Sequence, residues 1–164
     1  MKVRLFAAGA LAALIGLTAP RSGPAADTSS IYETLKLMQN HTVLFVATTE
    51  AKEAETLKGD GPHTLFAPTD AAFKRLDDAT IKKIATDKDT VKQLLRSHLV
   101  SGKRMAADLK KLDGMDLRTL RGNALKVEDA KDGLRVGGAK LVDADIRCSN
   151  GVIHVIDTVL PVTK

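Results

Sequence analysis

The second half of the chain is a series of short β-rich runs, each separated from the next by a turn that contains glycine. These runs are residues 117–120, 124–128, 134–136, 140–146 and 152–156. Strands spaced in this way by hairpin turns favour an antiparallel sheet. Most residues before Gly102 instead carry apolar side chains at helical spacing, and a single strand is expected among them at residues 64–66. Helices followed by strands predict an α+β fold, with N-terminal helices packed on an antiparallel β-sandwich.

The expected helices have recognisable starts and faces. Ser30 followed by Glu33 is a capping box, which predicts a first helix. Residues 42–57 predict one or two short helices, residues 81–85 another, and residues 105–109 a helical turn. Val91, Leu94, Leu95 and His98 follow the i, i+3, i+4, i+7 pattern, so His98 is expected on the apolar face of its helix and Ser97 on another face.

Residues 1–26 have the plan of a secretory signal peptide. Lys2 and Arg4 precede an apolar run over residues 5–19, and a stretch rich in Pro, Gly, Ser and Ala follows it. The run is shorter than the ~20 residues that span a bilayer, so no stable membrane span is expected after cleavage. Two cut sites, after Ala25 or Ala26, stay open. Residues 27–164 are expected to form a single domain that is secreted or periplasmic.

The basic charge of the chain comes largely from this leader. It holds three basic residues and no acidic one, so the count falls from 25 basic against 20 acidic residues to 22 against 20 without it. The remaining Lys and Arg residues are interspersed with Asp and Glu, which is typical of a solvated surface. Nucleic acid is therefore not an expected partner.

No arrangement of residues in the sequence indicates an enzyme, a cofactor or a metal. A nucleophile elbow, a P-loop and a dinucleotide-binding glycine motif are all missing. The four histidines are not at the spacing of metal ligands, and His41 and His63 are expected in turns or at the surface. Cys148 is the sole cysteine, so it cannot form an intrachain disulfide. It is either a small apolar side chain closing a turn, or a reactive thiol or a partner in an intermolecular disulfide.

Two segments carry most of the family information: TLFAPTDAAF at residues 64–73 and NGVIHVIDTVLP at residues 150–161. They resemble the two signature boxes of fasciclin domains, in the family's order. Between them the family carries a Tyr-His pair, and here Ser97-His98 occupies that place. The resemblance covers residues 28–162 and implies a compact wedge. The structural signature residues are Thr64, Phe66, Ala67, Pro68, Thr69, Asp70, Phe73, Asn150, Gly151, His154 and Asp157.

These signature residues are expected to form scaffold. Asn150-Gly151 is a strong hairpin signal and predicts a type I′ turn with positive φ at both residues. His98 and His154 are interpreted as core histidines, each with one hydrogen bond to the backbone or to a carboxylate such as Asp70 or Asp157.

The resemblance implies an exported, non-enzymatic adhesion module of a bacterial single-domain type, which binds proteins, surface polymers or matrix components. Animal fasciclin domains that bind integrins use a Glu-Pro-Asp-Ile-Met segment before the Asn-Gly turn, and residues 143–147 occupy that place here. The candidate interaction residues are Asp145 and Ile146, which match that segment, together with Ser97 and His98. A plainer interpretation makes Ile146 a core strand residue and Asp145 a solvated neighbour.

The alternative function belongs to another class. Some fasciclin domains enclose hydrophobic molecules between helices and sheet, so the resemblance also implies a carrier of a small apolar ligand, such as a carotenoid or a lipid. A chromophore that co-purifies with the native protein would favour the carrier. A ligand-free monomer would favour adhesion.

Overall fold

The computed structural model describes residues 28–161. The expected signal peptide and its cut site lie outside these residues. No helix within residues 28–161 combines the length and the apolar character needed to cross a membrane.

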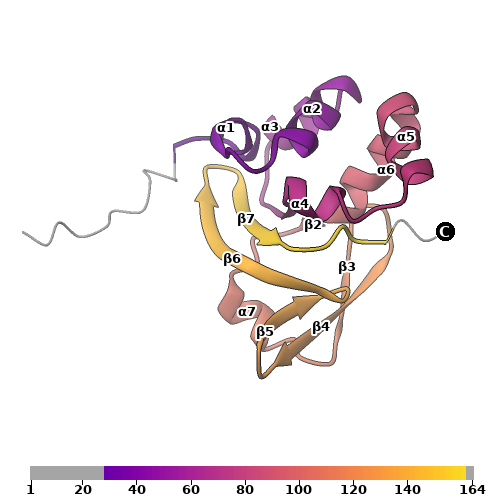
Figure 1. Ribbon diagram of the computed structural model, residues 1–164. Coiled ribbons are helices and arrows are strands. Elements are labelled where there is room, and N and C mark those ends of the chain that lie inside the picture. Colours follow the sequence, from indigo (N-terminus) through magenta and orange to yellow (C-terminus); the bar gives the residue numbers. More distant parts are fainter. Residues whose placement is uncertain (1–27, 162–164) are drawn as a thin grey trace, which may run out of the picture.

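Helices come first and most strands follow, as the sequence predicts. The helices are α1 (Ile31–Leu37), α2 (Thr42–Glu50), α3 (Ala54–Lys58), α4 (Asp70–Phe73), α5 (Asp78–Thr86), α6 (Lys88–His98) and α7 (Ala106–Lys110). The strands are β1 (His63–Pro68), β2 (Leu99–Ser101), β3 (Asp116–Arg118), β4 (Ala124–Ala130), β5 (Gly133–Val136), β6 (Ala139–Cys148) and β7 (Gly151–Ile156). Helices α1 to α6 gather at one end of the molecule and α7 lies apart from them, beside the lower strands (Figure 1).

The α+β class is confirmed, but the expected antiparallel sandwich is not. The strands form one mixed sheet in the order β2-β1-β7-β6-β5-β4-β3. The adjacent strands β1 and β7 run parallel, with His63 paired to Gly151 and Pro68 to Ile156. The outer strands approach each other through a bridge between Val100 and Thr119, which makes the sheet barrel-like. Parallel pairing is possible here because more than eighty residues connect β1 to β7.

The sheet separates two hydrophobic cores. Leu65 and Ala67 of β1 point into a core shared with helices α1, α2 and α6, whereas Phe66 points into a second core inside the curved sheet. Ile153 and Ile156 of β7 divide between the same two cores. Because both faces are covered, every residue of β7 is buried, and the strand reads as an apolar run rather than an alternation.

The capping box predicted at Ser30 is confirmed at the start of α1. The amide of Glu33 donates to Ser30 Oγ at 3.3 Å, and Glu33 Oε2 accepts from the amide of Ser30 at 3.0 Å. Residues 42–57 form two helices, α2 and α3. The three-residue strand β2 was not predicted, because it follows His98 without any turn residue.

Candidate functional site

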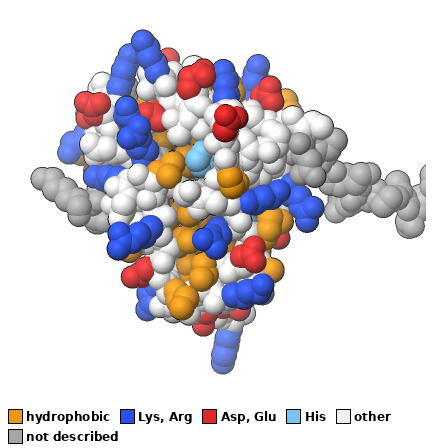
Figure 2. All heavy atoms as spheres, turned by 180° about the vertical axis from the view of Figure 1, so that it is seen from behind, with side chains coloured by type: hydrophobic (Ala, Val, Ile, Leu, Met, Phe, Trp, Pro, Cys, Tyr) orange, Lys and Arg blue, Asp and Glu red, His pale blue; other side chains and the backbone are white. Residues whose placement is uncertain are grey.

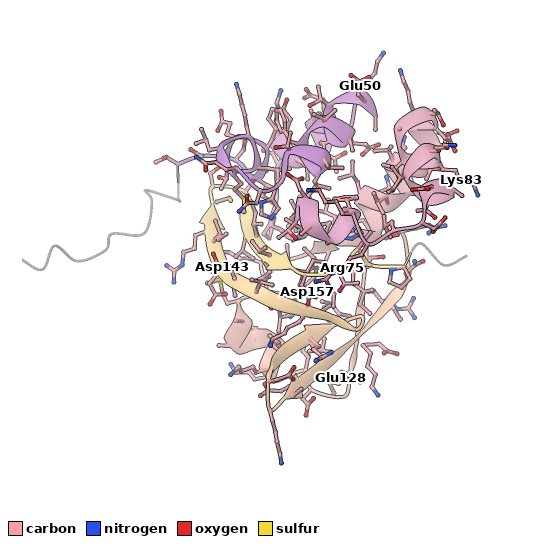
Figure 3. The ribbon with its side chains drawn as sticks, viewed as in Figure 1. Glu50, Arg75, Lys83, Glu128, Asp143 and Asp157 are labelled. Atoms are coloured by element: carbon pink, nitrogen blue, oxygen red, sulfur yellow. The ribbon has the colours of Figure 1, made fainter. Side chains whose placement is uncertain are left out.

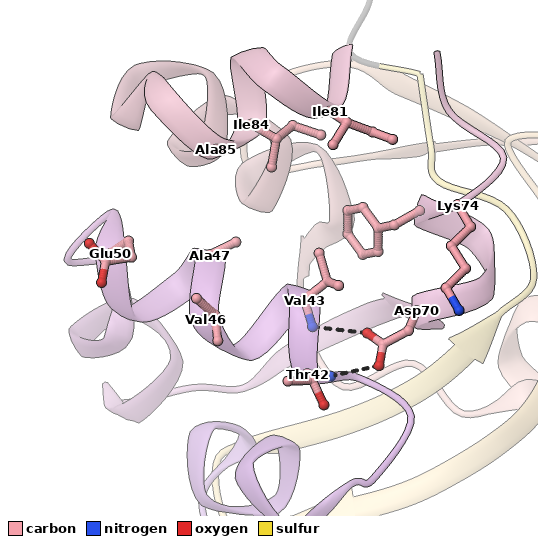
Figure 4. A pocket seen from close by; sticks show the side chains of 11 residues that line it. Thr42, Val43, Val46, Ala47, Glu50, Asp70, Lys74, Ile81, Ile84 and Ala85 are labelled. Atoms are coloured by element: carbon pink, nitrogen blue, oxygen red, sulfur yellow. Dashed lines mark hydrogen bonds between the residues drawn. The ribbon is translucent and has the colours of Figure 1, made fainter. Parts of the chain in front are cut away.

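An apolar groove lies between helices α2 and α5. Its volume is about 480 Å³. Helix α2 forms one wall and α5 the other (Figure 4). Phe73 of α4 also lines the groove. The lining residues are Thr42, Val43, Val46, Ala47, Glu50, Asp70, Phe73, Lys74, Ile81, Ile84 and Ala85. Grooves of this size and character are of the kind that binds small molecules.

The groove exists because helix α5 is amphipathic but only loosely packed. Ile81 and Ile84 lie on one face of α5, yet no residue of this helix is buried. Asp77 caps its start and Asp87 caps the start of α6, so α5 is held between two short links. Opposite it, the side chains of Val43 and Val46 on α2 remain 40% and 50% exposed. The exposed valines of α2 and the apolar face of α5 therefore line opposite sides of the groove.

Charged side chains stand at the two ends of the groove. At the start of α2, the carboxylate of Asp70 accepts the amides of Val43 at 2.9 Å and Thr42 at 3.2 Å (Figure 4). Asp70 thus caps α2, while Thr69 caps its own helix α4 through the amide of Ala72. Lys74 lies at the same end of the groove, and Glu50 at the opposite end.

Asp145 and Ile146 lie in an irregular part of β6. Asp145 has a φ of 62°, and the register of β6 against β7 shifts around it. Its carboxylate accepts the amide of Ala106 at 2.7 Å, which holds the start of α7. Ile146 is partly buried against the core under the helices. Asp145 is thus exposed but internally bonded, and the role of both residues in binding stays a prediction.

Ser97 and His98 are both buried at the end of α6. Ser97 was expected on a face away from the core, but it is fully buried, and its hydroxyl donates to the Gln93 carbonyl at 2.8 Å. His98 Nδ1 donates to the Leu94 carbonyl at 2.7 Å, and His98 Nε2 accepts the Leu160 amide at 2.9 Å. Neither side chain has exposed surface for a partner to touch.

Burial keeps three of the histidines neutral. Loss of solvent lowers the pKa of His98 to about 4, against a smaller opposing effect of the Leu94 carbonyl. Burial also lowers the pKa of His154 and of His41. His41 was predicted at the surface or in a turn. It directly precedes α2, but the residue is only 4% exposed, so the predicted surface position is wrong.

His154 joins β7 to the loop at Arg104 and to the irregular part of β6, rather than to a carboxylate side chain. Its Nε2 donates to the Arg104 carbonyl at 2.7 Å, and its Nδ1 accepts the amide of Asp145 at 3.2 Å. The ring also stacks on Phe66. Thr64 holds the same region, because its hydroxyl donates to the Gly102 carbonyl and accepts the Arg104 amide. His98 and His154 thus bond to backbone groups, one of the two kinds of partner that the sequence left open, and not to Asp70 or Asp157.

The turn at the start of the second signature box is not of the predicted type. Asn150 and Gly151 both lack the positive φ that a type I′ turn requires. The Asn150 side chain instead accepts the amide of Ile31 and donates to the carbonyls of Leu57 and Gly59. It therefore joins the β6–β7 turn to α1 and α3.

Asp157 fixes the end of β7. Its carboxylate accepts the amide of Lys140 at 3.0 Å, and its carbonyl accepts from Arg75 Nη1 at 3.4 Å. Figure 3 shows Arg75 and Asp157 side by side below α4.

Other candidate chemistry is sparse in the described part of the chain. Within residues 28–161, no three His, Cys, Asp or Glu side chains group closely enough to hold a metal ion. Cys148 is buried, with its sulfur 3.4 Å from Thr34 Oγ1, as expected of a small side chain next to a turn.

On the face seen in Figure 2, Lys and Arg side chains are spread among Asp and Glu, with a broken band of apolar side chains between them. Charge on this face indicates no particular class of partner.

Sequence reasoning missed the groove. The available signal was the run of apolar residues at 43–47, which exceeds what one buried helix face can hold, together with the amphipathic segment 81–85. The sequence could not show that these segments face each other, because α4 separates them along the chain and its position is set by β1.

Comparisons with known proteins agree with the fold. The Fasciclin domain model matches residues 39–162. An uncharacterized protein of Synechocystis, sll1735, is 35% identical over 122 residues, which are 74% of this chain and 90% of that protein. The cell surface glycolipoprotein MPB83 of Mycobacterium bovis is 40% identical over 106 residues, 65% of this chain and 46% of its own length.

A solved structure supports the same conclusion for the fold. A FAS1 domain pair from the insect cell adhesion molecule fasciclin I superposes with a TM-score of 0.71 at 20% identity, over 81% of this chain and 51% of that one. The family model covers most of the described residues, and sll1735 is matched over nearly its whole length. The chain therefore belongs to the fasciclin domain family.

Proposed function

We propose that this protein is an exported interaction module that binds proteins, surface polymers or matrix components outside the cytoplasm, in a secreted or periplasmic location. The fasciclin family consists of non-enzymatic adhesion and interaction modules, so the protein is not an enzyme. The observation that carries the export and the surface role is the 40% identity to a cell surface glycolipoprotein. The plan of residues 1–26 supports export as well.

The proposed contact segment is the bulged part of β6 at Asp145 and Ile146. Bulges redirect side chains and are frequent next to functional sites. A pull-down from the native envelope tests it, with Asp145→Asn as the variant, because Asn tolerates the positive φ of this position. Asp143→Asn is the matched control, an exposed carboxylate on the same strand (Figure 3). We expect the first variant to release the partner and the second to retain it. An envelope from which the parent protein retains nothing would contradict the interaction function.

The groove favours a second candidate function, the carriage of a small apolar ligand. Its walls are almost wholly apolar, and three of their side chains, Val43, Val46 and Ile81, remain 40%, 50% and 39% exposed. Extraction of the natively purified protein with organic solvent, followed by mass spectrometry, tests this function. A stoichiometric apolar molecule supports it, and an extract with no such molecule contradicts it.

A further inference from the structure

The two ends of the α2–α5 groove carry different charged side chains, Asp70 and Lys74 at one end and Glu50 at the other. Asp70 at one end is already engaged, because its two carboxylate oxygens accept the two amides at the start of α2. The start of a helix also carries partial positive charge, which offsets the carboxylate. The negative charge of Asp70 is therefore largely offset by its interactions with the start of α2.

Lys74 is different. It is exposed, lines the groove at the same end, and forms no ion pair with any residue in the range 28–161. Its ammonium group is thus available to a ligand whose apolar part lies between α2 and α5. At the far end, Glu50 closes α2 with a negative charge, next to the negative end of the helix dipole.

We propose that the groove binds a linear amphiphile with a single carboxylate, oriented with its carboxylate at Lys74 and its chain along α2. The proposal rests on the carrier function given above and adds the class of ligand and its direction. The nine residues of α2 make this wall about 13 Å long, so it suits an extended aliphatic chain. Glu50 repels a carboxylate, so the reverse orientation is disfavoured.

Three ten-carbon probes that differ only in the head group test the proposal: decanoate, decanol and decylammonium. Binding to the full chain is measured by calorimetry, and methyl NMR of Val43, Val46, Ile81 and Ile84 locates the probe. We expect decanoate to bind about twofold to fivefold more tightly than decanol, the range for a solvent-exposed ion pair. Decylammonium should bind most weakly at the Lys74 end.

Lys74→Gln removes the charge and keeps most of the side-chain length, and since Lys74 is exposed, the variant should fold normally. It should bind decanoate and decanol equally. Lys83→Gln is the matched control, an exposed lysine on α5 that does not line the groove (Figure 3). It should retain the preference for decanoate.

The outcomes distinguish a failure of the head-group assignment from a failure of the carrier function. Equal binding of decanoate and decanol to the parent protein, or a preference that survives in Lys74→Gln, overturns the head-group assignment while the carrier function stands. Tightest binding of decylammonium overturns the orientation, because Glu50 would then dominate. If none of the three probes shifts the groove methyl signals, the carrier function itself fails.

Discussion

Gly151 lies so close to His63 that a Cβ atom on Gly151 would overlap the His63 carbonyl. The two residues are paired at the start of the parallel β1–β7 ladder. A Cβ on Gly61 would overlap the Asn150 carbonyl in the same way, and the His63 amide donates to that carbonyl at 3.0 Å. Glycine at position 151 is therefore required for close approach of two backbones and not for a positive φ.

The first prediction separates these two reasons for a glycine. Gly151→Ala should lower the free energy of unfolding by about 3 kcal/mol, because the added methyl group forces the β1 and β7 backbones apart. Gly138→Ala is the control, since Gly138 has a φ of +84° and open space around its Cα, so only the backbone conformation opposes a side chain. That variant should cost about 1 kcal/mol. Urea unfolding measures both, and equal costs would contradict the close-approach explanation.

The second prediction concerns pH. Unfolded His98 takes up a proton below its ordinary pKa of 6.5, whereas folded His98 does so only near pH 4. The unfolded state binds more protons between these values, so stability is fully present above pH 6.5 and falls as the pH drops toward 4. We expect about 2 kcal/mol less stability at pH 5 than at pH 7 from this residue.

His98→Gln checks the assignment, because the amide can still donate and accept a hydrogen bond but does not titrate. Its urea midpoint should change less between pH 7 and pH 5 than that of the parent. Some slope should remain, since His154 and His41 also have lowered pKa values. Identical slopes in the two proteins would show that His98 does not carry the effect.

The third prediction compares the groove with the core. Ile81 on α5 is 39% exposed, whereas Leu94 on α6 is 1% exposed. Leu94→Ala should cost about 2 to 5 kcal/mol through the cavity that it leaves, and Ile81→Ala less than about 1 kcal/mol. Thermal or urea unfolding decides. A large loss for Ile81→Ala would mean that α5 is packed more tightly against α2 than the structure shows.

The fourth prediction tests the cap across elements. Asp70→Ala leaves the amides of Thr42 and Val43 without their acceptor and should lower stability by about 1 to 2 kcal/mol. Asp78→Ala changes an exposed carboxylate in the first turn of α5 and should have little effect. If the two variants melt alike, Asp70 does not support α2.

The local part of this fold was readable from the sequence. The Ser30 capping box and the residue spacing of α6 specify helices because their interactions lie within a few residues along the chain. The five C-terminal strands were expected because turn residues delimit them, and the two boxes identified the family. The type I′ geometry expected at Asn150-Gly151 was wrong there; instead Gly137 and Gly138, between β5 and β6, both have positive φ.

Contacts between distant segments were decided only by the tertiary structure. The parallel pairing of β1 with β7 and the bond between His98 and Leu160 join residues that no local pattern relates. The same is true of the groove, whose walls become neighbours because α2 and α5 both pack against α6. Sequence patterns specify which face of an element is apolar. Which other face covers it, or leaves it open, depends on how all the elements pack together.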